Sequence, residues 1–505
     1  MGARSADGRV LIASNRGPVS FRLSDDGELS VKRGGGGLVS GLSSVADHPN
    51  SLWVCAALSD ADRAAARAAE GGRLGLDGTA GGSGVRMLDI PPAIFHRAYN
   101  SVANSTLWFV HHMLYDTPNQ PHFGIAFERE WESFRTYNRE FAEALADEAG
   151  PPSPDRAPVR AAVQDYHLTL VPRMLADLRP DVRIAHFSHT PWAPPDYYRM
   201  LPDDVGREVL EGVLGADHAG FLAQRWADAF LDCCEAVLGA AGAHVDRARR
   251  EVTYQGHCTG IGVHPLGVDA DGLISRASEP DVRARQATLA EAADGRKLIV
   301  RIDRTELSKN IVRGLAAYRE LLTTHPEWHG RVVHLAFAYP SRHDLPEYRE
   351  YTASVQRLAR EISDEFGTEA WNPLILHVDD DYPRSLAAYR LADVLLVNPI
   401  RDGMNLVAKE GPILSERGCA LVLSREAGAA AELGADALLI NPYDVSGTAE
   451  ALHGALMMNG PERERRAGSL AQAAAAMPPT RWFADQLEAL DRLADRPVDE
   501  RSGSF

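Results

Sequence analysis

Short apolar runs alternate with longer amphipathic segments along almost the whole chain, and this alternation limits the folds open to it. A run such as residues 394–398 is long enough for one buried strand, and the segments between such runs have the length of crossover helices. Strands joined by helices form parallel sheets with helices on both faces. The sequence therefore predicts an α/β protein built from doubly wound parallel sheets.

The predicted strands fall into two series, one in each half of the chain. The first series is 9–14, 52–56, 161–164, 183–188 and 219–222, and the second is 298–302, 332–338, 374–378, 394–398, 420–424 and 438–440. The predicted helices between them include 130–148, 168–177, 225–238, 311–323, 348–365, 384–391 and 407–416. Two series indicate two Rossmann-like domains.

The length of 505 residues also exceeds what one hydrophobic core usually serves. The polar region 264–294 offers no strand and separates the two series. We therefore predict an N-terminal domain over residues 1–265 and a C-terminal domain over residues 266–475, with the hinge near the start of that region.

Charge and cysteine content exclude several classes of protein. Lys+Arg number 53 and Asp+Glu 70, a net charge of −17, which disfavours binding to nucleic acid or to anionic lipid. No stretch reaches about 18 uninterrupted apolar residues, and no apolar leader follows the charged first residues, so neither a membrane span nor export is expected. The five cysteines include no C-x-x-C pair, which favours a reducing cytoplasm.

Polar motifs of the first half stand just after predicted strands, where ligands of parallel sheets bind. The glycine run 34–37 lets backbone N–H groups approach an anion closely, although a flexible turn accounts for it equally. Asp165 and His189 follow two neighbouring strands and form either a functional or a merely structural polar rim. A zinc site at His186 and His189 is disfavoured because residues three apart on a strand face opposite sides.

The second half places cations and carboxylates at the same kind of position. Arg304 and Lys309 follow strand 298–302, where they and the N-terminus of the next helix suit a diphosphate; a surface ion pair is the alternative. Asp402 lies in the loop after strand 394–398, and Glu410 lies in the first turn of the following helix. Ionised carboxylates accept hydroxyl protons, so both suit sugar or ribose hydroxyls; helix capping is the alternative.

In their order along the chain, these motifs resemble those of the trehalose-6-phosphate synthases, over roughly residues 9–490. The matching segments are 14–16, 36–38, Tyr99 with Trp108, 165–167, 189–192, 304–309, 340–342, 401–410 and 441–444. The resemblance implies the two-domain GT-B fold of retaining glycosyltransferases that use nucleotide sugars. It also implies that a last helix, 476–494, crosses back to the first domain. The acidic residues, proline and serines of 495–505 separately predict a flexible tail.

The resemblance assigns roles residue by residue. The acceptor, glucose 6-phosphate, is given to Arg16, Tyr99, Trp108, Asp165 and Arg342. The nucleotide-glucose donor is given to Gly37, His189, Arg304, Lys309, Asp402, Gly403, Met404, Asn405, Leu406 and Glu410. Asp165, His189, Arg304, Lys309 and Asp402 are the residues expected to carry the reaction, which gives trehalose 6-phosphate. No metal and no cofactor beyond the co-substrate, GDP-glucose or UDP-glucose, is expected.

The chain departs from the family's usual pattern near several of these residues. Gln164 stands where the family commonly has His, and 304–309 reads R-T-E-L-S-K where it has R-L-D-Y-S-K. The W-x-G-W segment of the family is replaced at 53–56. The segments 337–339 and 379–384, which should flank the nucleotide base, also differ from the uridine-binding pattern. We therefore predict that GDP-glucose serves at least as well as UDP-glucose.

Three other functions remain open on the sequence. The first is a pseudo-glycosyltransferase that couples a nucleotide-cyclitol to an amino-cyclitol phosphate. The second is a noncatalytic sugar-phosphate sensor, whose mark would be the loss of sugar or diphosphate ligands. The third is a metal-dependent glycosyltransferase that uses Asp379–Asp381 as a D-x-D-like site. Small-molecule substrates are the expected partners, and a homo-oligomer remains possible.

Overall fold

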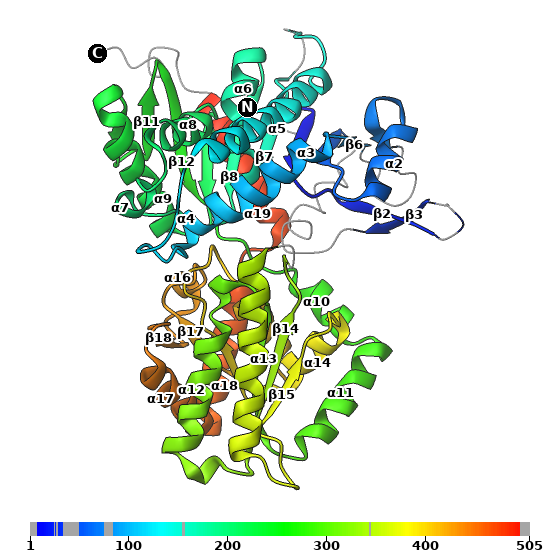
Figure 1. The fold of residues 1–505 in the computed structure, drawn as a ribbon, viewed down its shortest axis with the longest axis vertical. Helices are drawn as coiled ribbons and strands as arrows, with labels where there is room; N and C mark the ends of the chain where they lie inside the picture. The colour runs from blue at the N-terminus through cyan, green and yellow to red at the C-terminus, as the bar shows by residue number, and fades with distance from the viewer. Residues whose placement is uncertain are drawn as a thin grey trace, which may run out of the picture. The chain divides into compact units, whose positions relative to one another are not determined.

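The computed structural model describes residues 8–24, 26, 29–33, 50–74, 84–153, 157–342 and 345–494. Two compact units divide these residues (Figure 1). Unit 1 contains the described parts of Met1–Pro265 and Pro479–Phe505, and unit 2 is Leu266–Pro478. The predicted donor residue Gly37 and the tail 495–505 lie outside the described residues.

Unit 1 has a central sheet of ten described strands in the order β10-β11-β12-β9-β8-β7-β1-β4-β6-β5. The strands from β12 to β6 in this order are parallel, and β10, β11 and β5 pair antiparallel. The central strands bury nearly every side chain, as expected of a sheet covered on both faces. Their bounds are β1 Val10–Ser14, β4 Ser51–Ala56, β5 Arg73–Leu74, β6 Gly84–Leu88, β7 Arg160–Gln164, β8 Arg183–Ser188, β9 His218–Phe221, β10 His244–Asp246, β11 Glu251–Tyr254 and β12 His257–Val263. A separate hairpin pairs β2 Val19–Leu23 with β3 Leu29–Arg33.

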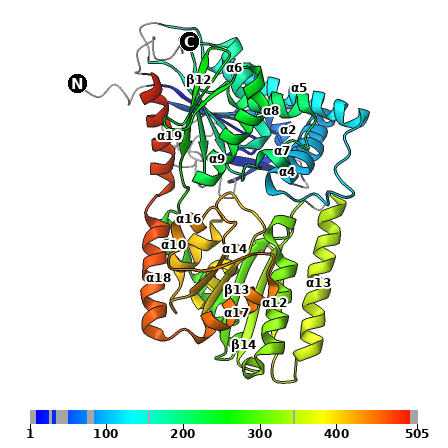
Figure 2. The same cartoon turned by 90° about the vertical axis from the view of Figure 1, so that its left-hand side faces the viewer.

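Helices cover both faces of this sheet. Right-handed crossovers place α5, α6, α8 and α9 on one face, and Figure 2 shows α19 along the other. The helices are α2 Asp60–Ala68, η1 Glu70–Gly72, α3 Pro92–His96, η2 Arg97–Leu107, α4 Trp108–His112, α5 Ile125–Glu148, η3 Tyr166–Leu168, α6 Val171–Leu178, α7 Pro195–Tyr198, α8 Asp203–Val213, α9 Gln224–Cys233, η4 Cys234–Leu238, η5 Gly239–Ala241 and α19 Pro479–Ala494. Trp482 of α19 donates from Nε1 to the carbonyl of His264 at 3.0 Å.

Unit 2 has a fully parallel sheet of six described strands in the order β15-β14-β13-β16-β17-β18. The strands are β13 Lys297–Arg304, β14 Val332–Tyr339, β15 Leu374–His377, β16 Val394–Val397, β17 Ala420–Ser424 and β18 Leu438–Ile440. The chain starts in the middle at β13, builds outward to β15, and returns to build from β16 to β18. This reversal beside β13 is the switch point at which doubly wound sheets bind ligands.

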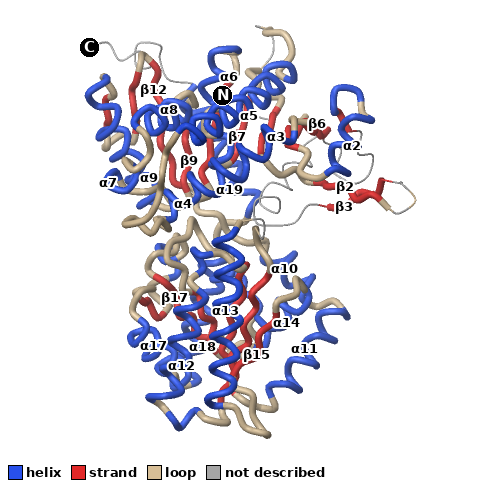
Figure 3. Tube along the Cα trace, in the orientation of Figure 1, coloured by secondary structure: helices blue, strands red, loops and turns tan. Residues whose placement is uncertain are grey.

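The helices of unit 2 form a layer on each side of the sheet (Figure 3). α12 packs beside α13 and α17, and α15 packs beside α14 and α18. The bounds are α10 Ala270–Ala277, α11 Pro280–Ala293, η6 Leu307–Lys309, α12 Ile311–Thr324, η7 Pro326–Trp328, α13 Pro346–Phe366, α14 Tyr382–Leu391, α15 Val407–Leu414, α16 Ala430–Leu433, α17 Val445–Met457 and α18 Gly460–Ala475.

The predicted α/β class and every predicted strand are confirmed, with ends that differ by at most two residues. The outer strands β10 to β12 were not predicted, because glycines interrupt the apolar pattern of residues 251–263. A hairpin signal was present there: Gln255 and Gly256 form the two-residue turn with φ of 51° and 78°. Positive φ at both positions is typical of the turn that joins adjacent antiparallel strands.

The described residues also bear on two expectations from the sequence, the absence of a membrane span and a reduced state of the cysteines. No helix among them combines the length and the apolar character that a bilayer span requires. All five cysteines are described, and each is a free thiol.

Candidate active site

The charged motifs of unit 2 meet at the carboxyl edge of its sheet. Arg304 is the last residue of β13 and pairs in register with Tyr339, the last residue of β14. Arg342 follows β14, and Asp402 follows β16, which lies on the other side of β13. Because these strands are parallel, residues that follow them lie along one edge.

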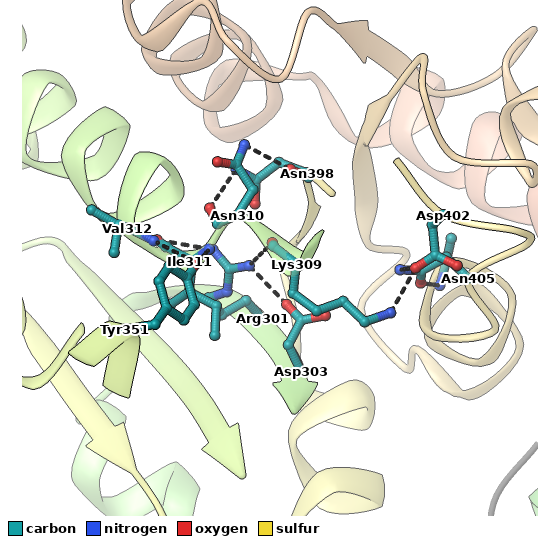
Figure 4. Close-up of polar contacts among 11 residues, drawn as sticks. Arg301, Asp303, Lys309, Asn310, Ile311, Val312, Tyr351, Asn398, Asp402 and Asn405 are labelled. Atoms are coloured by element: carbon teal, nitrogen blue, oxygen red, sulfur yellow. Dashed lines mark hydrogen bonds and ion pairs between the residues drawn. The ribbon is translucent and has the colours of Figure 1, made fainter. Parts of the chain in front are cut away.

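Lys309 reaches from the loop after β13 to the loop after β16. Its Nζ lies 2.6 Å from Oδ2 of Asp402, and Nδ2 of Asn405 donates to the same oxygen at 3.2 Å (Figure 4). Desolvation lowers the pKa of Lys309, but the carboxylates of Asp402, Asp303 and Glu306 outweigh it, so the pKa is raised. Lys309 is therefore an ammonium group at neutral pH.

A buried ion pair lies beneath the Lys309 loop. Arg301 is fully buried in β13, and its Nη2 lies 2.7 Å from Oδ2 of Asp303. The same guanidinium donates to the carbonyl of Lys309 at 3.1 Å (Figure 4). Gly314 makes room for it, because a Cβ there would lie 2.2 Å from Nη1 of Arg301. Arg301 thus holds the backbone of Lys309 in place.

The N-terminus of α12, which the sequence places behind a possible diphosphate site, is capped by a residue of another helix. The hydroxyl of Tyr351 accepts from the backbone N–H of Ile311 at 2.6 Å and of Val312 at 3.4 Å (Figure 4). These amides are the first of the helix and already have a partner.

Arg304 is paired with a carboxylate that the sequence analysis did not assign a role. Nη2 of Arg304 lies 3.0 Å from Oε1 of Glu306, whose side chain is completely buried. The hydroxyl of Ser341 donates to the same Oε1 at 2.9 Å. The next residue, Arg342, donates to the hydroxyl of Tyr348 at 2.8 Å. Arg304 itself remains 58% exposed and open to a ligand.

The loop that carries Asp402 is fixed by the segment after β17. The N–H of Gly428 donates to the carbonyl of Asp402 at 3.0 Å, and the N–H of Ala429 donates to that of Met404 at 2.9 Å. Gly428 must be glycine, because a Cβ would lie 1.9 Å from the carbonyl oxygen of Gly403. The loop then turns into α15 through Asn405, which has a φ of 78°.

Glu410 lies in the first turn of α15, as predicted, and its charge is poorly stabilised. Desolvation raises its pKa to about 7, although the hydroxyl of Tyr389 donates to Oε2 at 2.9 Å. Its carboxylate is suited to accept hydrogen bonds from hydroxyl groups of a ligand.

In unit 1, Asp165 and His189 lie side by side at the carboxyl ends of β7 and β8. The N–H of His189 donates to Oδ1 of Asp165 at 3.3 Å, and Nε2 of His189 lies 3.0 Å from Oε1 of Gln164. Desolvation lowers the pKa of His189 to about 3, so the ring is neutral.

The aromatic residues predicted for the acceptor lie close to this pair. The ring of Tyr99 stacks on His167 with centroids 5.5 Å apart, and Trp108 lies 5.6 Å from Tyr166. Arg16 follows β1 and is exposed. Unit 1 thus places Arg16, Asp165 and His189 at the carboxyl ends of β1, β7 and β8. Tyr99 and Trp108 lie beside the rings of His167 and Tyr166, which follow β7.

One aspartate of the alternative metal site, Asp381, is already engaged by other residues. Oδ2 of Asp381 lies 2.9 Å from Arg285 and 3.0 Å from Arg384, and Oδ1 caps α14. Asp379 and Asp380 are exposed. An aspartate that already neutralises two arginines is a poor metal ligand.

Within the described ranges, one group of side chains is close enough to hold a metal ion, and it lies elsewhere. It consists of His325, Glu327 and His453, just beyond the last residue of α12. His325 pairs with Glu327 at 3.3 Å and with Glu450 at 3.1 Å. The indole of Trp328 donates to Nδ1 of His453 at 3.1 Å. The side chains of this group are therefore already paired with one another and with other residues of the protein.

A family comparison accounts for the polar motifs at the carboxyl edges of the two sheets. The sequence pattern of glycosyltransferase family 20 matches residues 8–492. The chain belongs to glycosyltransferase family 20. Curated relatives include the probable alpha,alpha-trehalose-phosphate synthase (UDP-forming) 2 of Arabidopsis thaliana, 32% identical over 500 residues. The alignment covers 97% of this chain but only 58% of that protein. The alpha,alpha-trehalose-phosphate synthase (UDP-forming) of Schizosaccharomyces pombe is 33% identical, over 92% of this chain and 86% of its own.

Solved structures agree with this membership. The crystal structure of an alpha,alpha-trehalose-phosphate synthase (UDP-forming) from Burkholderia vietnamiensis superposes with a TM-score of 0.81 at 26% identity. The superposition covers 96% of this chain and all of that one. The family 20 chain therefore has the GT-B fold that the resemblance implied.

The site of this family 20 chain also contains residues that sequence reasoning missed. Arg301, Asp303, Glu306 and Tyr389 all support a predicted ligand-binding residue. A signal for the first two was present, because the apolar strand L-I-V-R-I-D-R carries charges at positions that a fully buried strand should not tolerate. Tyr389 is distant in sequence from Glu410 and gave no such signal.

We predict that replacing Glu410 with Gln removes a pH dependence of stability. Its folded-state pKa of about 7 lies above the ordinary 4.5, so wild type takes up a proton on folding between these values. Wild-type stability therefore falls as pH rises from about 4.5 to about 7. Denaturant unfolding of both proteins between about pH 5 and pH 8 should show Glu410→Gln gaining relative stability as pH rises. A constant difference across this range would contradict the assignment.

Proposed function

We propose that this chain transfers glucose, with retention, from a nucleotide diphosphate glucose to glucose 6-phosphate and so forms α,α-trehalose 6-phosphate. The observation that carries the proposal is the cluster of Lys309, Asp402 and Asn405 beside Arg304 at the carboxyl edge of the unit 2 sheet. It combines cations for a diphosphate with carboxylate and amide oxygens for sugar hydroxyls. The names of its relatives give the same reaction.

The donor residues act on the leaving group. When the bond between glucose C1 and the phosphate oxygen breaks, the nucleotide diphosphate gains negative charge. Arg304 and the ammonium of Lys309 stabilise that charge as it develops. Asp402 accepts hydrogen bonds from hydroxyl groups of the glucose and so orients it, and Glu410 accepts hydrogen bonds from hydroxyl groups of the ribose. We assign no metal ion to this step.

The acceptor is held by its phosphate and by its sugar ring. Arg16 and Arg342 suit a phosphate dianion, and Tyr99 and Trp108 offer flat apolar walls to a pyranose. The anomeric hydroxyl of the acceptor forms the new bond to C1 on the face that the phosphate leaves. Its proton passes to the departing phosphate oxygen, so no protein nucleophile is needed. We place this reaction in the cytoplasm, where the five free thiols would stay reduced.

The direct test is an assay of the purified chain with glucose 6-phosphate and UDP-, GDP- or ADP-glucose. The expected product has the mass of trehalose 6-phosphate and releases trehalose on phosphatase treatment. Formation in excess chelator would exclude the metal-dependent alternative. A product only with cyclitol substrates would instead support the pseudo-glycosyltransferase, and ligand binding without any product would support the sensor.

We predict that GDP-glucose is used at least as well as UDP-glucose, although the relatives above are named UDP-forming. Because Asp381 is engaged by arginines, the exposed Asp380 is the carboxylate that would accept the N1–H and amine of guanine. Asp380→Asn should then lower turnover with GDP-glucose alone, with Asp379→Asn as the control. UDP-glucose more than about tenfold better, or ~1.4 kcal/mol, in wild type would overturn this prediction.

We predict that Lys309→Ala and Arg304→Ala each lower kcat by about 10²–10³, the effect typical of a preorganised group that meets developing charge. Steady-state kinetics and thermal unfolding should be measured together. Lys297→Ala is the matched control, because Lys297 also pairs with an aspartate, Asp393 at 3.2 Å, but at the start of β13. Wild-type kcat with reduced thermal stability in Lys309→Ala would show that this lysine is merely structural.

We predict that Arg16→Ala and Arg342→Ala raise the KM for glucose 6-phosphate and leave nucleoside diphosphate affinity nearly unchanged. Each charge-assisted contact is worth about 1.5–3 kcal/mol, which corresponds to roughly a tenfold to 150-fold change. Calorimetry with UDP and GDP measures the second quantity. Arg357→Ala, at an exposed arginine of α13, is the control. Equal losses for nucleotide and acceptor would refute the acceptor assignment.

A further inference from the structure

Glu306 is a buried carboxylate surrounded by the cations of the proposed site. Its side chain is completely inaccessible, a position that charged groups occupy only when they are well compensated. Burial raises its pKa, but the charges of Arg304, Arg342 and Lys309 outweigh this and bring the pKa to about 2. Glu306 is therefore an anion at neutral pH.

The contacts of Glu306 join two segments that the sequence keeps apart. Oε1 lies 3.0 Å from the guanidinium of Arg304, at the end of β13. The same oxygen accepts from the hydroxyl of Ser341 at 2.9 Å, in the turn after β14. Ser341 directly precedes Arg342, which has a φ of 44°. One oxygen thus supports the donor arginine and the turn that carries the acceptor arginine.

Among the described residues, no hydrogen bond of the other carboxylate oxygen explains the burial. Oε2 of Glu306 is buried and makes no hydrogen bond among the described residues. A fully buried carboxylate with one unsatisfied oxygen costs stability, so a purely structural role would be served better by a neutral residue. The arrangement instead suits a group kept for its effect on its neighbours.

We propose that Glu306 is a common positioning residue, which holds Arg304 for the donor diphosphate and, through Ser341, Arg342 for the acceptor phosphate. This inference rests on the proposed function for the roles of the two arginines. Glu306 does not touch either substrate: both phosphates are anions, and the carboxylate lies behind the cations that would meet them.

A purely electrostatic role of Glu306 and a positioning role predict opposite effects of Glu306→Gln on the binding of nucleoside diphosphate. The substitution keeps the shape of the side chain and removes one negative charge from a cationic site. If only the net charge mattered, nucleoside diphosphate would bind more tightly. If Glu306 positions the arginines, the neutral amide releases Arg304, and both substrates bind more weakly.

The experiment compares four variants by two measurements. Calorimetry gives the Kd of UDP and of GDP without turnover, and steady-state kinetics gives kcat and the KM for glucose 6-phosphate. Glu306→Gln removes the negative charge that Arg304 and Arg342 both face, and Ser341→Ala removes only the hydrogen bond to the Arg342 turn. Glu306→Asp keeps the charge and restores the residue that the family usually has. Ser446→Ala is the control, because it removes a serine–glutamate hydrogen bond, to Glu320, on the surface of the same unit.

Glu306→Gln should raise the Kd of the nucleoside diphosphate and the KM for glucose 6-phosphate by about tenfold or more each. Ser341→Ala should raise the KM alone. Glu306→Asp should stay within about threefold of wild type on both measures, as should Ser446→Ala.

Tighter binding of the diphosphate by Glu306→Gln, or a change in only one of the two constants, would overturn the inference. If Glu306→Gln does not fold, Ser341→Ala decides, because an unchanged KM there also overturns it. A wild type that forms no trehalose 6-phosphate would refute the proposed function instead, and the Kd measurement would still test the link to Arg304.

Discussion

Cations that are to meet a phosphate must first be held in a folded chain without one, and the unit 2 site depends on this constraint. Three cations of the site are each paired with a carboxylate. Lys309 pairs with Asp402, Arg301 with Asp303, and Arg304 with Glu306. The pairs differ in exposure: Arg301 is fully buried and cannot reach a ligand, whereas Arg304 is largely exposed. Burial thus separates the groups that build the site from the groups that can bind.

The parallel sheet explains how residues about 90 positions apart form one pair. β13 lies between β14 and β16, so the loops after these three strands leave the sheet at the same edge. Lys309 and Asp402 come from the loops after β13 and β16, and Glu306 and Ser341 from those after β13 and β14. The reversal of strand order beside β13 therefore decides which motifs can touch.

The alternation of apolar runs with amphipathic segments predicted the parts of the structure that depend on local sequence. Fully buried strands such as β14, V-V-H-L-A-F-A-Y, are read from composition and length alone, and the motifs at their ends follow. The partners of Arg304 and Glu410 could not be predicted in the same way. Glutamate is usually a surface residue and tyrosine is often a core residue. The residue types of Glu306 and Tyr389 therefore did not predict their contacts, which only the folded chain shows. The partner of the amides at the start of α12 could not be predicted either, because Tyr351, the residue that caps them, lies in another helix.

One of the few lysines of this chain carries a buried charge. It has four lysines, and arginine supplies all other side-chain cations. Lys409 is completely buried, with Nζ 2.6 Å from Glu432 and 2.8 Å from the carbonyl of Leu266. A compact ammonium can enter such a space, whereas a planar guanidinium has five donors to satisfy. Leu266 is the first residue of unit 2, so the helix that carries Glu410 is tied through Lys409 to the point where that unit begins.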